Sequence, residues 1–171
     1  MQSFKKLYSD YNNDIYNFLF KITGYDQALA EELTQETFYQ AFLSITKFKG
    51  KCHIKTWLCQ IAKNIYYQQL RREKREFLTM KNISEEKSTL TMTPSPHTEV
   101  EHAELIQKAL FTINSFDDKT RDVMLYRLYS DLSYAQISLL LEISEGSAKV
   151  IFYRGKLALQ IRLREDYGYE I

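Results

Sequence analysis

Apolar residues recur at intervals of three and four positions along most of the chain, which is the spacing of an amphipathic α-helix. The first such stretch covers residues 4–22, and Gly24 is placed to end that helix. A second helix is predicted at residues 26–46 and a third at residues 54–75. No stretch alternates apolar and polar residues with the period of two that a β-strand shows. The first half of the chain is therefore predicted to be helical.

The apolar period fades over residues 77–102, where Pro94 and Pro96 stand among Ser, Thr and Glu residues. This composition is typical of a flexible linker. The period resumes at Ala103, and four more helices are predicted, at residues 103–115, 117–129, 134–141 and 145–164. We therefore expect an all-α fold of two small helical domains, residues 1–76 and 103–171, joined by the linker.

The formal net charge of +1 conceals an uneven distribution of charge. Residues 1–46 hold three basic and six acidic side chains, whereas residues 47–75 hold nine basic side chains and one acidic side chain. Residues 146–164 add five basic side chains and no acidic one. Two separate cationic stretches on a nearly neutral chain are typical of surfaces that bind a polyanion such as nucleic acid.

Two of the C-terminal helices have the signals of a helix-turn-helix. Ser133 and Gln136 have the spacing of a capping box, which marks a helix start. Ser144 can cap the next helix, so only residues 142–144 separate the two helices. This arrangement matches a DNA-binding helix-turn-helix, and a solvated helical hairpin is the alternative.

The last helix is predicted to have an inward side, formed by Ala148, Phe152, Gly155 and Leu159 at a 4-3-4 spacing. A basic outer side suits insertion into a DNA major groove, where phosphates supply binding strength and base edges supply choice. The residues that lie on the other sides of this last helix are Lys149, Tyr153, Arg154 and Lys156.

The second helix is predicted to present a mixed acidic, aromatic and apolar face. Its outward residues are Glu32, Gln35, Glu36, Tyr39 and Leu43. A face that is only solvated rarely places Tyr and Leu among its charges, so a protein partner and simple solvation are both open interpretations.

The third helix is predicted to turn Trp57, Ile61 and Ile65 inward. The opposite face holds amides, an aromatic ring and cations, and the Lys-rich loop at residues 47–53 extends the same surface. Cations can hold phosphates, and Tyr67 can stack on an unpaired base, so nucleic acid is favoured over a solvated basic face. The face consists of Gln60, Lys63, Asn64, Tyr67, Arg71 and Lys74.

The chain offers little for a metal site or a secreted protein. Six residues separate Cys52 from Cys59, which fits neither a CxxC metal pair nor a disulfide framework, so we expect reduced thiols. No apolar run approaches the roughly 18 to 20 residues that cross a bilayer, and the first residues lack a signal-peptide pattern. We expect a cytoplasmic protein without a cofactor.

Several segments resemble, in order and spacing, the motifs of the extracytoplasmic-function (ECF) sigma factors of bacterial RNA polymerase. They are EELTQETF at residues 31–38, TWL at 56–58, IAKN at 61–64, LRR at 70–72, LSYAQI at 132–137 and ISEGS at 143–147. The resemblance implies that residues 1–76 are sigma region 2, residues 77–102 the variable linker and residues 103–171 region 4.

The resemblance also implies a function without catalysis, in which the factor directs core RNA polymerase to promoters and helps to melt the DNA. The implied partners are core RNA polymerase, promoter DNA and an anti-sigma factor, which in this family is often a membrane protein. The residues implied to contact core polymerase are Glu32, Gln35, Glu36 and Tyr39. Those implied to contact the minus-10 element are Lys49, Lys51, Lys55, Gln60, Lys63, Asn64, Tyr67, Arg71, Arg72, Lys74 and Arg75. Those implied to contact the minus-35 element are Glu145, Ser147, Lys149, Val150, Tyr153, Arg154 and Lys156.

Some residues depart from the pattern of that family. Glu142 stands where a turn glycine is usual, so a left-handed backbone there would cost on the order of 1 kcal/mol. Ile151 replaces a common Arg, Val150 a common small polar residue and Leu157 a frequent base. Apolar contact with thymine methyl groups is one substitute for the lost polar contacts. Lys63 replaces the usual Arg and keeps only its charge.

Two other functions are weighed against this one. The first is a helix-turn-helix regulator that does not bind polymerase, and the motifs at residues 57–72 argue against it. The second is a small helical enzyme. His53, His97 and His102 are scattered, and neither a nucleophile with its base nor a phosphate-binding glycine loop is visible.

Overall fold

The computed structural model describes residues 2–81 and 97–169, and all the regular structure in this part of the chain is helical. One short 3-10 turn, Ile45–Lys47, follows the second helix. The α-helices are α1 (Gln2–Ile22), α2 (Gln27–Ser44), α3 (Ile54–Lys81), α4 (His97–Asn114), α5 (Asp118–Tyr129), α6 (Tyr134–Leu141) and α7 (Glu145–Tyr167). The prediction of an all-α chain is confirmed.

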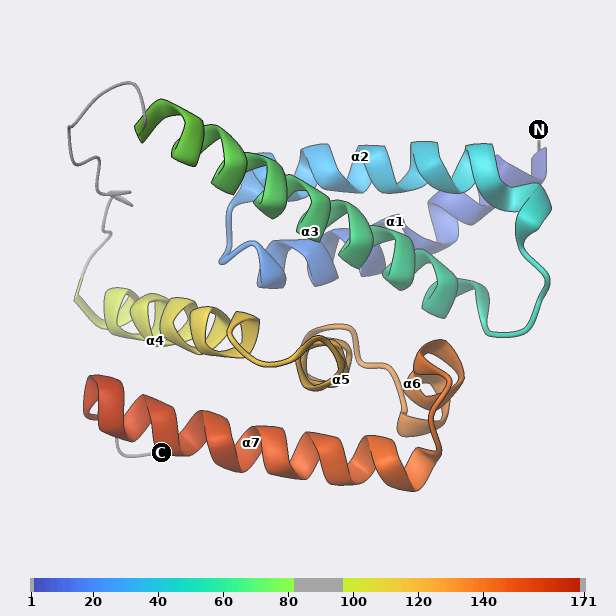
Figure 1. Cartoon of the computed structure of the whole chain (residues 1–171). Helices are drawn as coiled ribbons and strands as arrows, with labels where there is room; N and C mark the ends of the chain where they lie inside the picture. The colour runs from blue at the N-terminus through green and yellow to red at the C-terminus, as the bar shows by residue number, and fades with distance from the viewer. Residues whose placement is uncertain (1, 82–96, 170–171) are drawn as a thin grey trace.

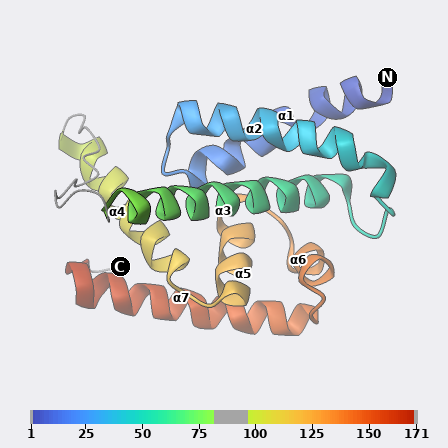
Figure 2. The same cartoon turned by 45° about the horizontal axis from the view of Figure 1, so that its top comes forward.

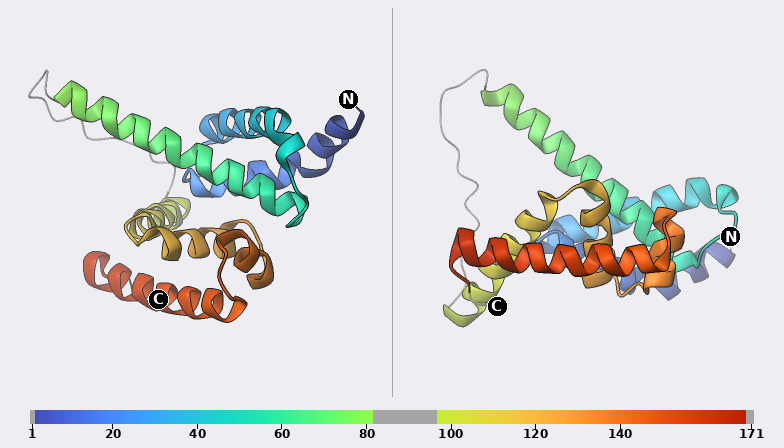
Figure 3. Two further views of the ribbon diagram at one scale, coloured as in Figure 1. Left: turned by 45° about the vertical axis from the view of Figure 1, so that its right-hand side comes forward. Right: turned by 60° about the horizontal axis from the view of Figure 1, so that its bottom comes forward.

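Two helices are longer than the sequence pattern indicated. α3 was expected to end near Arg75 and continues to Lys81, and α4 was expected near Ala103 and begins at His97. The ends of the predicted linker are therefore helical, and residues 82–96 lie outside the described residues. Phe77 and Leu78 remain 48% and 50% exposed, and the last turns of α3 project beyond the other N-terminal helices (Figure 3). The last turns of α3 bury no apolar face, so their sequence shows no apolar period. The hydrophobic pattern therefore could not predict them.

The helices are arranged in two layers. α1, α2 and α3 pack on one another and form the N-terminal half, and α4 to α7 form the C-terminal half beneath it (Figure 1). α5 lies between α7 and the N-terminal half, where it contacts α1, and α6 contacts α3 (Figure 2). The two halves therefore touch through the middle of the molecule.

Buried side chains of both halves join in one hydrophobic cluster. Ile15, Phe18 and Leu19 of α1 are at most 1% exposed, as are Val123 and Tyr126 of α5. The Phe18 and Tyr126 rings stack across the boundary with centroids 6.3 Å apart. The core is thus continuous from one half to the other.

Local hydrogen bonds account for the start of α2 and for the burial of two of its threonines. The Asp26 carboxylate accepts a hydrogen bond from the Leu29 amide at 3.0 Å and caps the helix. Thr34 and Thr37 can be buried, because each hydroxyl donates a hydrogen bond to a backbone carbonyl one turn earlier. Phe42, on the same helix, is 54% exposed, and its ring lies edge-to-face with that of Phe4, with the ring centroids 5.1 Å apart.

The helix-turn-helix is formed by α6 and α7, as predicted. Ser133 and Gln136 make the full capping box, and Ser144 accepts a hydrogen bond from the Ser147 amide at 3.0 Å. Glu142, in the turn, has φ 54° and ψ 44°, which is the left-handed conformation that glycine usually supplies. In the described part of the chain, no helix combines the length and apolar character needed to cross a membrane.

Candidate nucleic-acid interface

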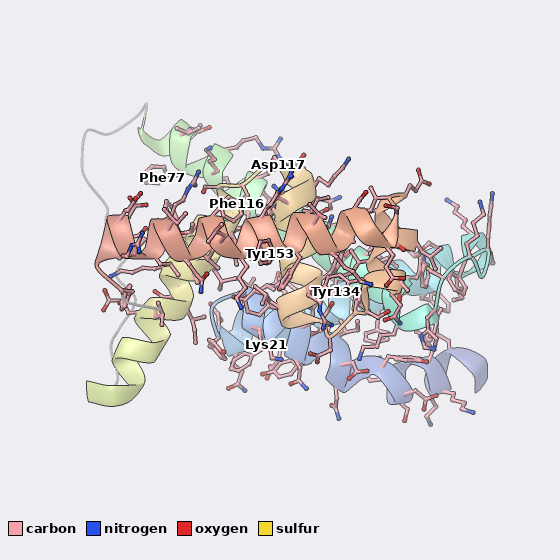
Figure 4. All side chains as sticks on the ribbon, turned by 90° about the horizontal axis from the view of Figure 1, so that it is seen from below. Lys21, Phe77, Phe116, Asp117, Tyr134 and Tyr153 are labelled. Carbon is pink, nitrogen blue, oxygen red and sulfur yellow. The ribbon has the colours of Figure 1, made fainter. Side chains whose placement is uncertain are left out.

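α7 is the outermost helix of the C-terminal half, and Figure 4 shows it lying across the molecule seen from below, with Tyr153 on it. Its inward side is as predicted: Ala148 and Gly155 are buried, and Phe152 and Leu159 are partly buried. A Cβ atom built on Gly155 would lie 2.9 Å from the Met124 sulfur, so this glycine lets α7 approach α5 closely.

All seven residues that the sequence implied for the minus-35 element are exposed on α7. Tyr153 is 70% exposed and Val150 is 49% exposed. Lys149 forms an ion pair with Glu145 at 2.7 Å, whereas Arg154 and Lys156 form no ion pair within the described residues. The exposed residues are Glu145, Ser147, Lys149, Val150, Tyr153, Arg154 and Lys156. This face can offer free cations to a polyanion and an aromatic ring beside them.

The three apolar residues of α7 that depart from the family pattern differ in exposure. Leu157 is 49% exposed, so it lies on the surface with Val150. Ile151 is half-buried and packs against the core. The side chain at position 151 therefore supports the helix packing, and the outer face holds a stripe of Val150, Tyr153 and Leu157 among its cations.

The predicted basic face of α3 is divided in the structure. Its distal part is solvent-facing: Asn64, Arg71, Arg72, Lys74 and Arg75 are exposed, as are Lys49 and Lys51 of the preceding loop. Lys55 and Gln60, nearer the start of the helix, are half-buried, and Lys55 pairs with Asp14 at 2.9 Å. The exposed cations of the predicted face thus lie at the loop and at the far end of α3, where Arg72 pairs with Glu76 at 3.8 Å.

The middle of the same face is covered by the C-terminal half. The Lys63 ammonium pairs with the Asp122 carboxylate of α5, and both side chains are only 11% exposed. The Tyr67 hydroxyl donates a hydrogen bond of 2.8 Å to Asn114 Oδ1 of α4, and the Arg121 guanidinium lies 4.2 Å from the centre of the Tyr67 ring. Burial raises the pKa of Tyr67 above its usual range, so this side chain stays neutral. Lys63 and Tyr67 lie on the predicted side of α3 but are not exposed.

The four residues implied for polymerase contact line one groove between α2 and α3. Its volume is about 730 Å³. The α2 wall holds Glu32, Gln35, Glu36 and Tyr39, and the α3 wall holds Ile65, Gln68, Gln69, Arg72 and Arg75. The groove therefore has an acidic and aromatic wall facing an amide-rich and basic one.

The α3 wall of this groove is what the sequence reasoning missed. Arg72 and Arg75 were grouped with the nucleic-acid face, and Gln68 and Gln69 were assigned no role. Residues 65, 68, 72 and 75 are spaced by three and four positions, so they lie on one side of α3. A helical wheel of α3 would have grouped these four residues as a possible partner of the outward face of α2.

Comparisons with known proteins agree with the two-half arrangement. The Sigma-70 region 2 family profile matches residues 7–76 and the Sigma-70, region 4 profile matches residues 107–159, together well over half of the chain. The chain is 29% identical over 155 residues to the ECF RNA polymerase sigma factor SigM of Bacillus subtilis, covering 91% of each chain. It is 27% identical over 170 residues to SigW of the same organism, covering 95% of this chain and 90% of SigW. Among solved structures, the sigma factor RpoE of Bartonella quintana, crystallised with the anti-sigma factor NepR, aligns with a TM-score of 0.64 at 20% identity. That alignment covers 97% of this chain and 99% of RpoE.

Proposed function

Because the chain belongs to the ECF RNA polymerase sigma factors, we propose that its three exposed surfaces divide the work of promoter recognition among them. The outer face of α7 enters the major groove at the minus-35 element. The loop at residues 49–53 and the exposed far end of α3 engage the minus-10 element. The groove between α2 and α3 receives core RNA polymerase.

One observation carries this division: the cationic surfaces of the two halves are separate, and neither of them is the acidic wall of the groove. Phosphates bind cations, so the DNA is assigned to the first two surfaces. The Glu32 and Glu36 wall repels phosphates, and its exposed Tyr39 offers the aromatic anchor that protein interfaces favour. The polymerase is therefore assigned to the groove.

Each proposed DNA contact follows from the chemistry of its side chain. Arg71, Lys74 and Arg154 are free to hold phosphates. The exposed Val150 and Leu157 can contact thymine methyl groups, in place of the polar contacts usual in this family. On the minus-10 side, the exposed Lys49 and Lys51 can hold phosphates of the opened strand. The chain itself performs no covalent chemistry, and the polymerase makes RNA.

A regulator that does not bind polymerase is not favoured, because the N-terminal half matches region 2 and offers the groove just described. We propose residues 1–76 and 103–171 as the two working units and the cytoplasm as their compartment. The RpoE neighbour is held by an anti-sigma factor, and we propose a regulator of that kind for this chain as well.

Reconstituted run-off transcription tests the proposal. Core polymerase is incubated with the factor and a pool of genomic DNA fragments, and the RNA products identify the promoters. The Arg71→Ala, Lys74→Ala, Arg154→Ala variant is expected to bind those promoters more weakly. In a plot of log affinity against log salt concentration, the slope for this variant should be shallower by about 2 to 3. Each lost phosphate contact removes about 0.9 from that slope.

The matched control loses the same charge elsewhere. Lys5, Lys6 and Lys119 are exposed and lie off the proposed surfaces, so their replacement by Ala should leave both affinity and slope nearly unchanged. Equal effects of the two triple variants, or a folded wild-type factor that yields no transcripts, would count against the proposal.

A further inference from the structure

We propose that the outer side of α7 is a docking surface for an acidic amphipathic helix of a partner protein, which competes there with promoter DNA. The inference rests on the proposed function for the competing ligand, and it adds a second ligand to the same helix. It is carried by a continuous apolar stripe, the α7 stripe, which consists of Val150, Tyr153, Leu157 and Ile161.

The α7 stripe lies opposite the side of the helix that packs into the core. Its residues follow one another at intervals of three, four and four positions, and they are 49%, 70%, 49% and 37% exposed. Ala148, Gly155 and Leu163 are the buried residues of α7. The helix is therefore apolar on two opposite sides, whereas a surface helix is usually polar on its outer side. A contiguous exposed apolar stripe of this kind indicates an interaction surface.

DNA accounts for the beginning of the α7 stripe but not for its end. A recognition helix contacts base edges with its N-terminal residues, and the major groove is only about 12 Å wide. Val150 lies in the second turn of α7. Ile161 lies three turns further on, about 24 Å along the helix axis from Glu145 at 1.5 Å per residue. The exposed side chain of Ile161 is therefore left for a ligand other than DNA.

The charges around the α7 stripe select an acidic partner. Residues 146–164 hold five basic side chains and no acidic one, and the exposed Arg154 and Lys156 flank the stripe on its two sides. Neither cation forms an ion pair with another described residue. Carboxylates on the flanks of a partner helix would pair with them, as charges beside the apolar seam of a coiled coil do. A second copy of this chain would bring cationic flanks together, so self-association is disfavoured.

The length of the α7 stripe sets the size of its occupant. From Val150 to Ile161 it covers three helical turns, about 17 Å. A partner helix with apolar residues at three- and four-residue spacing would interdigitate with it. Such a helix covers Tyr153 and Arg154, which the proposed function assigns to the minus-35 element. The groove between α2 and α3 lies in the other half, so the partner would block promoter recognition without displacing polymerase.

Fluorescence anisotropy with a synthetic probe tests this surface on the full-length chain. The probe is a labelled amphipathic helical peptide with a leucine seam at three- and four-residue spacing and glutamates on both flanks. One control peptide carries lysines in place of the glutamates, and another carries alanines in place of the leucines. The wild-type chain should bind the probe at least tenfold more tightly than either control peptide. Duplex DNA with a promoter found by run-off transcription should displace the probe.

Ile161→Gln separates the two ligands of α7. Glutamine is a good helix former, so the variant should keep its circular dichroism spectrum. It should bind the probe at least fivefold more weakly, because apolar contact is lost, and bind the promoter duplex within twofold of the wild type. The matched control is Phe111→Gln on α4. It removes a 70% exposed apolar side chain away from the α7 stripe and should leave the affinity for the probe within twofold.

Equal losses of probe and duplex affinity in Ile161→Gln would assign the whole stripe to DNA and overturn the proposal. Equal affinities of the wild type for all three peptides overturn it as well, as does a dimer in sedimentation that Ile161→Gln abolishes. The run-off assay judges the proposed function separately, because a chain that yields no transcripts can still bind the probe through Ile161.

Discussion

The turn of the helix-turn-helix holds Glu142 in a left-handed backbone conformation, at φ 54°. An L-residue with a Cβ atom is strained there and glycine is not. We expect Glu142→Gly to raise the free energy of unfolding by about 1 kcal/mol, measured by urea denaturation. The strain was expected from the resemblance to the ECF sigma factors, because a turn glycine is usual in that family at the position of Glu142.

Glu73→Gly is the control for that substitution. Glu73 is exposed in the interior of α3, where glycine is unfavourable by about 1 kcal/mol relative to good helix formers. The two Glu→Gly changes should therefore shift the urea midpoint in opposite directions. A shift of the same sign would mean that the turn is not strained.

The two thiols differ in accessibility. Both cysteines are free; Cys59 is buried at 0% exposure, and burial raises its pKa to about 12, whereas Cys52 is half-buried. Only a thiolate reacts readily with disulfide reagents. In the native chain, the Cys52 thiol should react with a disulfide reagent within the time of a mixing experiment. The Cys59 thiol should react only in denaturant. Simultaneous reaction of both would show that α3 does not bury Cys59.

At the scale of helices, Gly155 fixes the approach of α7 to α5. An added Cβ would lie 2.9 Å from the sulfur and 3.1 Å from Cγ of Met124, which is fully buried, and 3.2 Å from Cγ2 of Thr120. Gly155→Ala is therefore expected to destabilise the chain by about 1 to 3 kcal/mol, the usual effect of overpacking, despite the better helix propensity of Ala.

Gly146→Ala is the matched change on the same helix. A Cβ there would meet only Ser144 Oγ at 3.9 Å, an ordinary contact. The melting temperature should rise or stay constant for this variant and fall for Gly155→Ala. If both variants were more stable than the wild type, α7 would have to pack farther from α5 than described.

The helices show which parts of a site the apolar period can predict. On α7, the 4-3-4 spacing of Ala148, Phe152, Gly155 and Leu159 identified the inward side, because that helix packs within its own half. On α3, the same reasoning placed Trp57, Ile61 and Ile65 inward, yet these three are only partly buried against the core. It also missed the cover over Lys63 and Tyr67. Their partners, Asp122 and Asn114, lie 59 and 47 residues further along the chain, and no local pattern encodes such contacts.

At the scale of the whole molecule, the positions of the charged surfaces on the two helical layers determine which partners can be bound together. The acidic wall of α2 faces Arg72 and Arg75 of α3 across one groove, whereas the exposed cations of α7 belong to the other half of the molecule. We therefore propose that polymerase bound in the groove leaves the α7 face open to duplex DNA. The division into two helical halves was predictable from composition, whereas their contact through α5 depends on the three-dimensional packing of the chain.

That packing also predicts how the molecule responds to alkali. Burial raises the pKa of Tyr66 and of Tyr129 from 10.0 to about 12, and it raises that of Tyr126, at the boundary between the halves, well above its usual range. The folded chain thus holds these protons more tightly than the unfolded chain. Their contribution to stability is complete below pH 10 and is lost as the pH rises through about 12.

A spectrophotometric titration of tyrosinate, followed together with circular dichroism, measures this effect. A late fraction of the tyrosines should ionise between about pH 10 and 12, in step with the loss of helical signal. In denaturant the late fraction should disappear, because every tyrosine then titrates near its ordinary value of about 10. If the native chain gave one transition near that value while its helices persisted, the tyrosines could not be buried between the two layers, and the closed packing of α5 on α1 and α3 would not hold.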